Sequence, residues 1–271
     1  MKTLRHSITV ALVVALTAVP TAALATDDVG TETRPETDQT VSDRPSDRPH
    51  DLSEIKARAL GVIDKQLEVL SGLRAKIDGA PHITNGHAGR LLGEIGATSN
   101  GLESLARQIE AATTPEELRR LIEQLGDYKI KQVLAPKTFQ VIASDTLVFA
   151  AGRLEAYSER LAEIVARFED AGFEVDQAWR LLEEMNNGIT EAIRLAGPVA
   201  ENVIGLRPGD WPDPAQSILT AGRSNLGTAR QNVRAAHANG KEIVEFLHGL
   251  VNRTDVATDA ARTDAAPAIV G

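Results

Sequence analysis

The 271-residue chain contains no cysteine and few aromatic residues. The lack of cysteine excludes disulfides, thiolate catalysis, cysteine-based zinc sites and a lipobox-type lipid anchor. Aromatic residues make up 3% of the chain, which is typical neither of an aromatic-rich β-sandwich nor of a surface that stacks nucleic-acid bases. After the first 25 residues no apolar run reaches the ~18 residues of a spanning helix, so we expect no later membrane segment.

Basic residues are fewer than acidic residues. The chain has 29 Lys and Arg against 38 Asp and Glu, a formal net charge of −9. Because an acidic protein is repelled by a phosphate backbone, we expect no nucleic-acid partner. Hydrophobic residues make up 42% of the chain, which is enough to form a core and excludes disorder throughout.

The N-terminus has the three parts of a secretory signal. Basic residues precede an apolar stretch at residues 8–20, and Ala23-Leu24-Ala25 forms an A-x-A cleavage site. An uncleaved membrane anchor is the alternative, but the apolar stretch is short and Pro20 ends it. We therefore predict a signal peptide at residues 1–25 and a secreted, extracytoplasmic protein without stable membrane insertion after cleavage.

Composition divides the rest of the chain into three parts. Residues 26–50 are rich in Asp, Glu, Thr and Pro, which predicts a disordered acidic linker. Residues 253–271 are rich in Ala, Thr and Asp, which predicts a disordered tail. Residues 51–252 lie between them and are predicted to form a helical bundle domain.

Apolar residues recur every three or four positions through this domain, the period of an amphipathic helix, and strand-like alternation is almost absent. We predict an all-α fold, an elongated antiparallel helical bundle with coiled-coil-like packing. The predicted helices cover residues 51–78, 88–112, 114–125, 136–171, 175–203 and 215–251. Pro136 is expected to mark a kink or restart and to push Ala135 out of the α region.

Small residues lie on the apolar seam of the last predicted helix. Gly222, Ala229, Ala236 and Gly240 occupy seam positions, and small side chains permit two backbones to approach closely. We therefore expect this helix to pack tightly against a neighbour.

Asp145 is the only ionisable residue between positions 138 and 152, in a helix that is apolar nearly all round and is expected at the centre of the bundle. A buried carboxylate needs a partner. Tyr128, Lys129 and Lys137 precede it, so we predict a buried polar network of these four residues, with a structural ion pair between Asp145 and a lysine. A ligand-binding or proton-transfer site is the alternative.

Two other groups of polar residues lie in predicted loops. His82 and His87 flank the turn between the first two helices, where we expect a solvated turn rather than a metal site. Asp210, Trp211 and Asp213 lie in a Pro-rich loop, residues 205–214, that we expect to be non-helical. This loop is either a recognition surface or a place where Trp211 closes the end of the bundle.

One stretch carries a family resemblance. The sequence YKIKQVLAPK at residues 128–137, followed by ASD at residues 143–145, resembles a signature of uncharacterised secreted helical proteins of actinobacteria and related lineages. The likeness in organisation spans residues 52–250. The chain has Lys129 where that signature has arginine and Ser144 where it has alanine. The resemblance implies secretion, helices and coiled-coil-like packing, and no activity.

The motifs of common enzymes are missing. The sequence contains no G-x-S-x-G, no H-E-x-x-H and no phosphate-cradling glycine loop. We expect no enzymatic activity, no cofactor and no metal, and a structural or protein-interaction role with an unknown protein or cell-envelope partner. The alternative is an extracytoplasmic bundle that binds a small apolar or lipidic ligand in its core; a hydrolase is a weaker third possibility.

Export gives the first testable prediction. When the full chain is expressed in a bacterial host, the protein outside the cytoplasm should begin at Thr26, because signal peptidase cleaves after an A-x-A site. N-terminal sequencing or intact-mass measurement of the exported protein checks this. A membrane-bound protein that still begins at Met1 would instead establish the uncleaved anchor.

Overall fold

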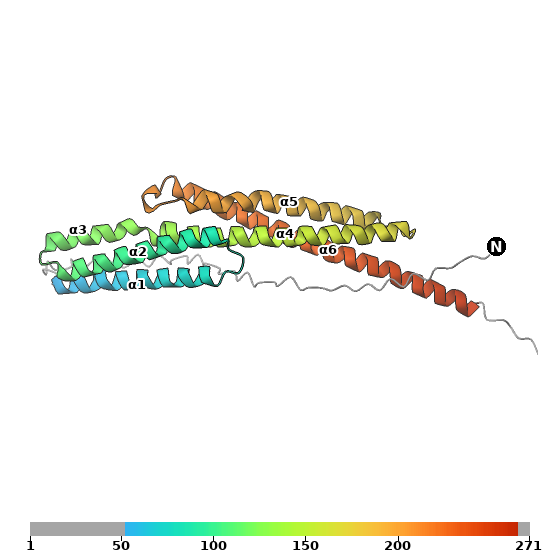
Figure 1. Cartoon of the computed structure of the whole chain (residues 1–271), viewed down its shortest axis with the longest axis horizontal. Coiled ribbons are helices and arrows are strands. Elements are labelled where there is room, and N and C mark those ends of the chain that lie inside the picture. Colours follow the sequence, from blue (N-terminus) through green and yellow to red (C-terminus); the bar gives the residue numbers. More distant parts are fainter. Residues whose placement is uncertain (1–51, 265–271) are drawn as a thin grey trace, which may run out of the picture. The chain divides into compact units, whose positions relative to one another are not determined.

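The computed structural model describes residues 52–264, and the side chains of residues 52–253. This part of the chain contains six α-helices and no strand, so the predicted all-α bundle is confirmed (Figure 1). The predicted signal peptide and acidic linker lie outside the described residues. The α-helices are α1 (Leu52–Asp78), α2 (Asn85–Ala111), α3 (Pro115–Leu125), α4 (Ala135–Asp170), α5 (Asp176–Ile204) and α6 (Ala215–Asp264).

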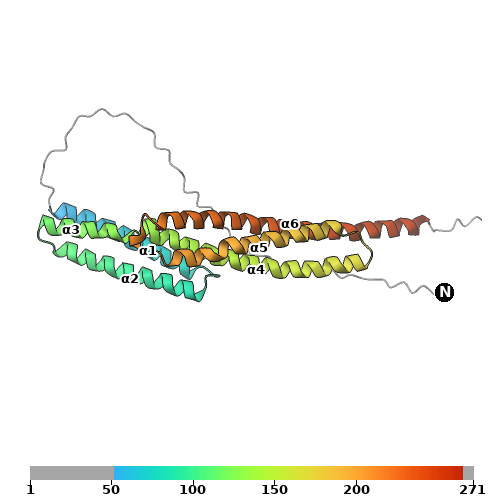
Figure 2. The ribbon, with the colours of Figure 1, turned by 90° about the horizontal axis from the view of Figure 1, so that it is seen from above.

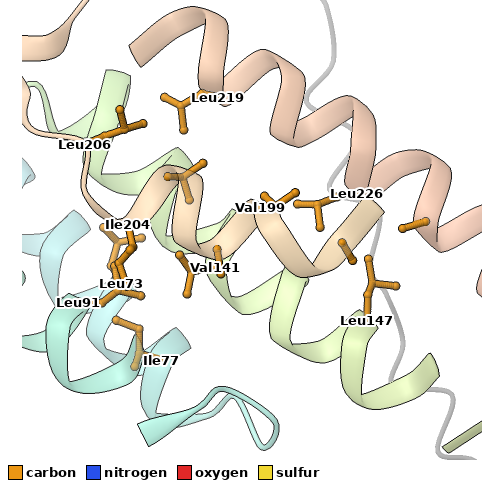
Figure 3. Close-up of a cluster of buried hydrophobic side chains, with 14 of the residues drawn as sticks. Leu73, Ile77, Leu91, Val141, Leu147, Val199, Ile204, Leu206, Leu219 and Leu226 are labelled. Carbon is orange, nitrogen blue, oxygen red and sulfur yellow. The ribbon is translucent and has the colours of Figure 1, made fainter. Parts of the chain in front are cut away.

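The helices form two groups that share a core. Helices α4, α5 and α6 pack against one another, and α1 and α2 form a hairpin (Figures 1 and 2). Helix α3 follows α2 and connects the open end of this hairpin to α4. The hairpin contacts the group through α1 against α4 and α2 against α5. Figure 3 shows the shared core: Leu73 and Leu91 of the hairpin lie near Val141 of α4 and Ile204 of α5. Burial of these apolar side chains holds the two groups together.

Side-chain caps set the start of two helices. Helix α2 begins at Asn85, three residues before the expected start, because Thr84 Oγ1 accepts a hydrogen bond from the His87 backbone N–H at 3.2 Å. Helix α3 begins at Pro115 as predicted, with Thr114 Oγ1 accepting from the Glu117 N–H at 3.3 Å.

The connection before α4 is irregular. Lys129 has a φ of 46°, in the left-handed region, and a π-helical turn, η2 (Ile130–Leu134), leads into α4. The predicted restart at Pro136 is confirmed, because α4 begins at Ala135 and Pro136 lies in its first turn. The expectation for Ala135 is wrong: its φ of −67° and ψ of −51° are helical, and its N–H is bonded to the Ile130 carbonyl across the π turn.

Helix α6 continues to Asp264, past its expected end at Val251 and into the segment predicted to be a disordered tail. Alanine has the highest helix propensity of all residues, and residues 253–264 contain three alanines and no Gly or Pro. The helix therefore continues through this segment despite its low apolar content.

The prediction of close packing by α6 is confirmed. Ala229 and Ala236 are buried, with 0% and 1% of their surface exposed. A Cβ atom added to Gly222 would collide with Oε1 of Gln140 from α4, and one added to Gly240 would lie 2.8 Å from the Tyr157 ring. These positions are small because side chains of α4 occupy the space above them.

This packing predicts opposite effects for two glycines of α6. Gly222→Ala should lower the free energy of unfolding by about 1–3 kcal/mol, because the new methyl group displaces the buried Gln140 side chain. Gly227→Ala should raise it by up to about 1 kcal/mol, because Gly227 has no atom within 4 Å of its Cβ position and alanine is the better helix former. Urea unfolding of both variants measures the difference. Equal stability of the two variants would show that α6 does not approach α4 this closely.

Candidate functional site

Buried polar residues gather on α4 where the α1–α2 hairpin docks. The first half of α4 buries Lys137, Thr138, Gln140, Ser144 and Asp145. Two of these are ionisable, and each finds a partner on α2. We call the set of His87, Glu94, Lys137, Asp145 and Glu201 the polar junction, and it is the candidate site.

Asp145 is held by the start of α2. Its Oδ2 accepts a hydrogen bond from the Thr84 backbone N–H at 2.8 Å and lies 2.8 Å from Nδ1 of His87. The Asp145 side chain is 8% exposed, so these bonds replace most of its water. The predicted ion pair between Asp145 and a preceding lysine is wrong.

His87 joins three helices. The side chain is 14% exposed; Nδ1 faces Asp145 of α4, and Nε2 lies 3.1 Å from Oε1 of Glu201 on α5. Partial burial alone would lower the pKa of His87, but hydrogen bonds and charge attraction from the two carboxylates outweigh it and raise the pKa above the ordinary 6.5. The expectation that His87 lies in a solvated turn is wrong, because the docked hairpin places it against α4.

Lys137 makes a second, separate pair. Its side chain is fully buried, and Nζ lies 2.6 Å from both carboxylate oxygens of Glu94. Nζ also donates to the Leu206 carbonyl at 2.7 Å, in the connection between α5 and α6. A buried ammonium needs such partners, so Lys137 ties α2 and the α5–α6 connection to α4.

The predicted pair of Asp145 with a lysine is wrong because the prediction considers only residues near Asp145 in the chain. Lys137 lies eight residues earlier on the same helix, about 12 Å along its axis, too far for a direct pair. The true partners are 58 and 61 residues away in sequence. One signal did exist: His87 precedes Leu91 and Ile95 at four-residue steps, which continues the buried seam of α2 back to the histidine.

The other residues of the predicted network lie apart from Asp145. Tyr128 is half-buried beside Gly101 of α2, and burial raises the pKa of its phenol. Lys129 is half-buried at the left-handed turn before η2. Among the described residues, no hydrogen bond or ion pair joins either side chain to Asp145.

Helix α4 is not buried all round, contrary to the prediction. Phe139, Val148 and Phe149 are 50%, 37% and 47% exposed. Helices α5 and α6 cover one side of α4 and the hairpin covers a second, which leaves the side of Phe139 and Phe149 to solvent. Val148 is nine residues from Phe139 and therefore lies on the opposite side of the helix. On Phe149 the ring of His82, from the hairpin turn, stacks at a centroid distance of 3.8 Å.

The Pro-rich loop is separate from the polar junction. Asp210 Oδ2 accepts a hydrogen bond from the Arg207 backbone N–H at 2.7 Å, within a 3₁₀ turn, η3 (Pro208–Asp210). Trp211 is half-buried and packs against the core, whereas Asp213 is exposed. This placement favours Trp211 as a cover for the end of the core over a recognition role for the loop.

A groove lies near the far end of the α5–α6 pair. It has a volume of about 330 Å³, and its lining includes Glu174, Asp176, Arg180, Phe246 and Arg253. It opens to solvent, and four of its seven lining residues are charged, so it differs from the closed apolar cavity that a bound lipid would need.

The described residues form neither a candidate metal site nor a membrane span. No group of three His, Asp or Glu side chains there could hold a metal ion. None of the helices in that part is long and apolar enough to span a membrane.

Comparison with known proteins gives no match: no family model, no curated protein and no solved structure matches the chain. The resemblance carried by residues 128–137 and 143–145 therefore stays a prediction.

The polar junction links α2 to α4 and α5. An aspartate on one histidine nitrogen is the arrangement that orients a general base in hydrolases. Here the second nitrogen of His87 is bound by Glu201. In the described part of the chain, no hydroxyl side chain is hydrogen-bonded to the ring.

The Lys137–Glu94 pair predicts an asymmetric pair of mutations. Glu94→Ala should cost about 3–5 kcal/mol of stability, because it strands a fully buried ammonium. Lys137→Met should cost clearly less, because methionine fills similar space and Glu94, 32% exposed, can turn to water. The double variant should resemble Lys137→Met alone.

Urea unfolding measures all three variants, with Arg194→Ala, which breaks the exposed Glu191–Arg194 pair, as a control without measurable loss. Equal losses from Glu94→Ala and Lys137→Met would contradict the burial of Lys137.

Proposed function

We propose that the mature chain is a secreted, non-enzymatic helical bundle at the cell envelope that acts by binding protein, and that its first partner is a second copy of itself. The supporting observation is an uncharged, partly exposed stripe on α4. We call it the α4 face and define it as Phe139, Ile142, Thr146 and Phe149.

The α4 face is a continuous stripe. Its residues are spaced three, four and three apart, which places them on one side of a helix. The two phenylalanines are about half exposed, and Ile142 and Thr146 are half-buried. The only charged residue between positions 138 and 152 is the buried Asp145. Single exposed apolar residues are common in proteins, but a contiguous apolar stripe indicates an interaction surface.

The spacing of the stripe is symmetric, which favours a second copy as the occupant. Spacings of three, four and three read the same in both directions about residue 144. In an antiparallel pair of α4 helices related by a two-fold axis, Phe139 therefore meets Phe149 of the other copy, and Ile142 meets Thr146. Such self-complementary contact is what a two-fold dimer requires.

The size of the face predicts a weak dimer. Each half-exposed phenylalanine offers about 100 Å². The face is thus well below the ~800 Å² per partner of a stable interface. The full chain carries a formal net charge of −9, and loss of Lys2 and Arg5 with the predicted signal peptide makes each mature copy more acidic; the repulsion between copies is screened by salt. Association should therefore depend on concentration and strengthen with added salt.

The alternative role, binding of an apolar ligand in the core, has less support. The seam positions of α6 are filled by close contacts with α4, and the groove at Glu174 is charged and open. Neither observation provides a space that an apolar molecule would prefer to water.

Sedimentation velocity tests the proposal on the mature chain, from about 5 to about 500 µM. The weight-average mass should rise with concentration, and Phe139→Ser with Phe149→Ser should abolish the rise, because it removes the apolar surface. Val62→Ser, at a 45% exposed valine of α1, is the matched control and should keep the rise. A constant mass for the unmodified chain would refute self-association, and a rise that survives in the double variant would place it on another face.

The absence of cysteine permits a test of orientation. Chains carrying Ile142→Cys and chains carrying Thr146→Cys should form mixed disulfides when oxidised together, because the two positions meet in the antiparallel pair. A parallel pair would instead favour disulfides between identical chains.

A further inference from the structure

The geometry around His87 requires a particular protonation state. Its two ring nitrogens lie 2.8 Å from Asp145 Oδ2 and 3.1 Å from Glu201 Oε1. A carboxylate can only accept hydrogen bonds, so each nitrogen must carry a hydrogen for both contacts to be hydrogen bonds. Only the imidazolium has both hydrogens.

Loss of one proton breaks one of the two contacts. The neutral ring keeps a single N–H, and the other nitrogen then turns a lone pair toward a carboxylate. Asp145 is buried and also accepts from the Thr84 N–H, so it needs the remaining N–H of His87 more. Glu201 is 69% exposed and can turn to water or to Arg90, whose Nη1 lies 3.9 Å from Glu201 Oε2.

We propose that His87 is a pH-operated latch: the protonated ring ties the start of α2 to both α4 and α5, and the neutral ring releases Glu201 and with it the attachment to α5. The charged groups that face His87 are Asp145 from α4 and Glu201 from α5, with Arg90 of α2 reaching Glu201. Both direct neighbours are anionic, so the site favours the cation.

The pH range in which the latch opens lies above 6.5. The two carboxylates raise the pKa of His87 above 6.5, whereas the unfolded chain keeps the ordinary value. The attachment is therefore complete below pH 6.5 and is lost as the pH rises through the raised pKa of the folded protein.

The released segment adjoins the α4 face. His82, in the same hairpin turn, stacks on Phe149 at an interplanar angle of 11°. Because Asp145 keeps the start of α2 on α4 in both protonation states, release of Glu201 lets the turn shift about this contact, and such a shift changes how much of Phe149 the His82 ring covers. This consequence rests on the proposed function, whereas the latch itself does not.

The experiment combines NMR titration with a distance measurement in the mature chain. The ring signals of His87 should titrate with a pKa above 6.5, and Glu201→Gln should lower that pKa because it removes a negative charge. Glu191→Gln, an exposed glutamate of the same helix, is the matched control and should leave the titration unchanged.

Spin labels report the movement. Gly86→Cys is at an exposed position of α2 with no atom within 4 Å of the Cβ site, and Asn202→Cys is exposed on α5. Dipolar EPR between the labels should give one narrow distance distribution near pH 6 and a broader one near pH 9, with the same midpoint as the His87 titration. His87→Gln and Glu201→Gln should each remove this pH dependence.

Two results would overturn the latch. One is an unchanged distance distribution while His87 titrates, which would make the contact a fixed structural pair. The other is a pH-dependent distance that survives Glu201→Gln. Because Glu201 is exposed, this variant keeps the test valid if His87→Gln fails to fold. Self-association measured at the same two pH values is a separate readout, so failure of the α4 face leaves the EPR result standing.

Discussion

The arrangement of the two helix groups depends on one requirement: charged side chains removed from water must be paired. Helix α4 buries an ammonium at Lys137 and a carboxylate at Asp145, two helical turns apart. The α1–α2 hairpin supplies Glu94 for the first, and His87 with the Thr84 N–H for the second. Apolar contacts such as those in Figure 3 would tolerate sliding of the hairpin along α4. The cation Lys137 and the anion Asp145 each need a partner of opposite charge on α2, and both are paired in only one position of the hairpin.

The other side of α4 is organised by close approach. Gln140 donates to the Leu219 carbonyl at 2.7 Å and extends over Gly222 of α6, and Ser144 donates to the Ala196 carbonyl of α5 at 2.8 Å. Small residues let polar side chains reach a neighbouring backbone. Helix α4 is therefore bound on one side by charge pairs and on another by hydrogen bonds to carbonyls. Its third side has neither, which is why the exposed phenylalanines are found there.

The helices were predictable because their signals are local. The period of apolar residues, the Thr114–Pro115 start and the small residues of α6 each depend on neighbours along the chain, so the sequence alone predicts them. The partner of Asp145 was not predictable in this way, since it depends on how α2 docks on α4. An apolar helix likewise does not reveal how many neighbours it has: α4 has the composition of a surrounded helix and one open side.

The two pairs of the polar junction differ in how they respond to pH, and this difference determines what the latch can do. Lysine and glutamate side chains ordinarily keep their charges across the neutral range, whereas histidine changes its charge within it. The hairpin is therefore held permanently at Lys137 and, through the Thr84 N–H, at Asp145, whereas the contact of His87 with Glu201 is conditional. When His87 becomes neutral, Glu94 still binds Lys137 about two turns further along α2. Release then consists of a small shift of the start of α2 relative to α5 while Asp145 and Lys137 keep it on α4, not detachment of α1 and α2, and the shared core at Leu73 and Leu91 stays closed.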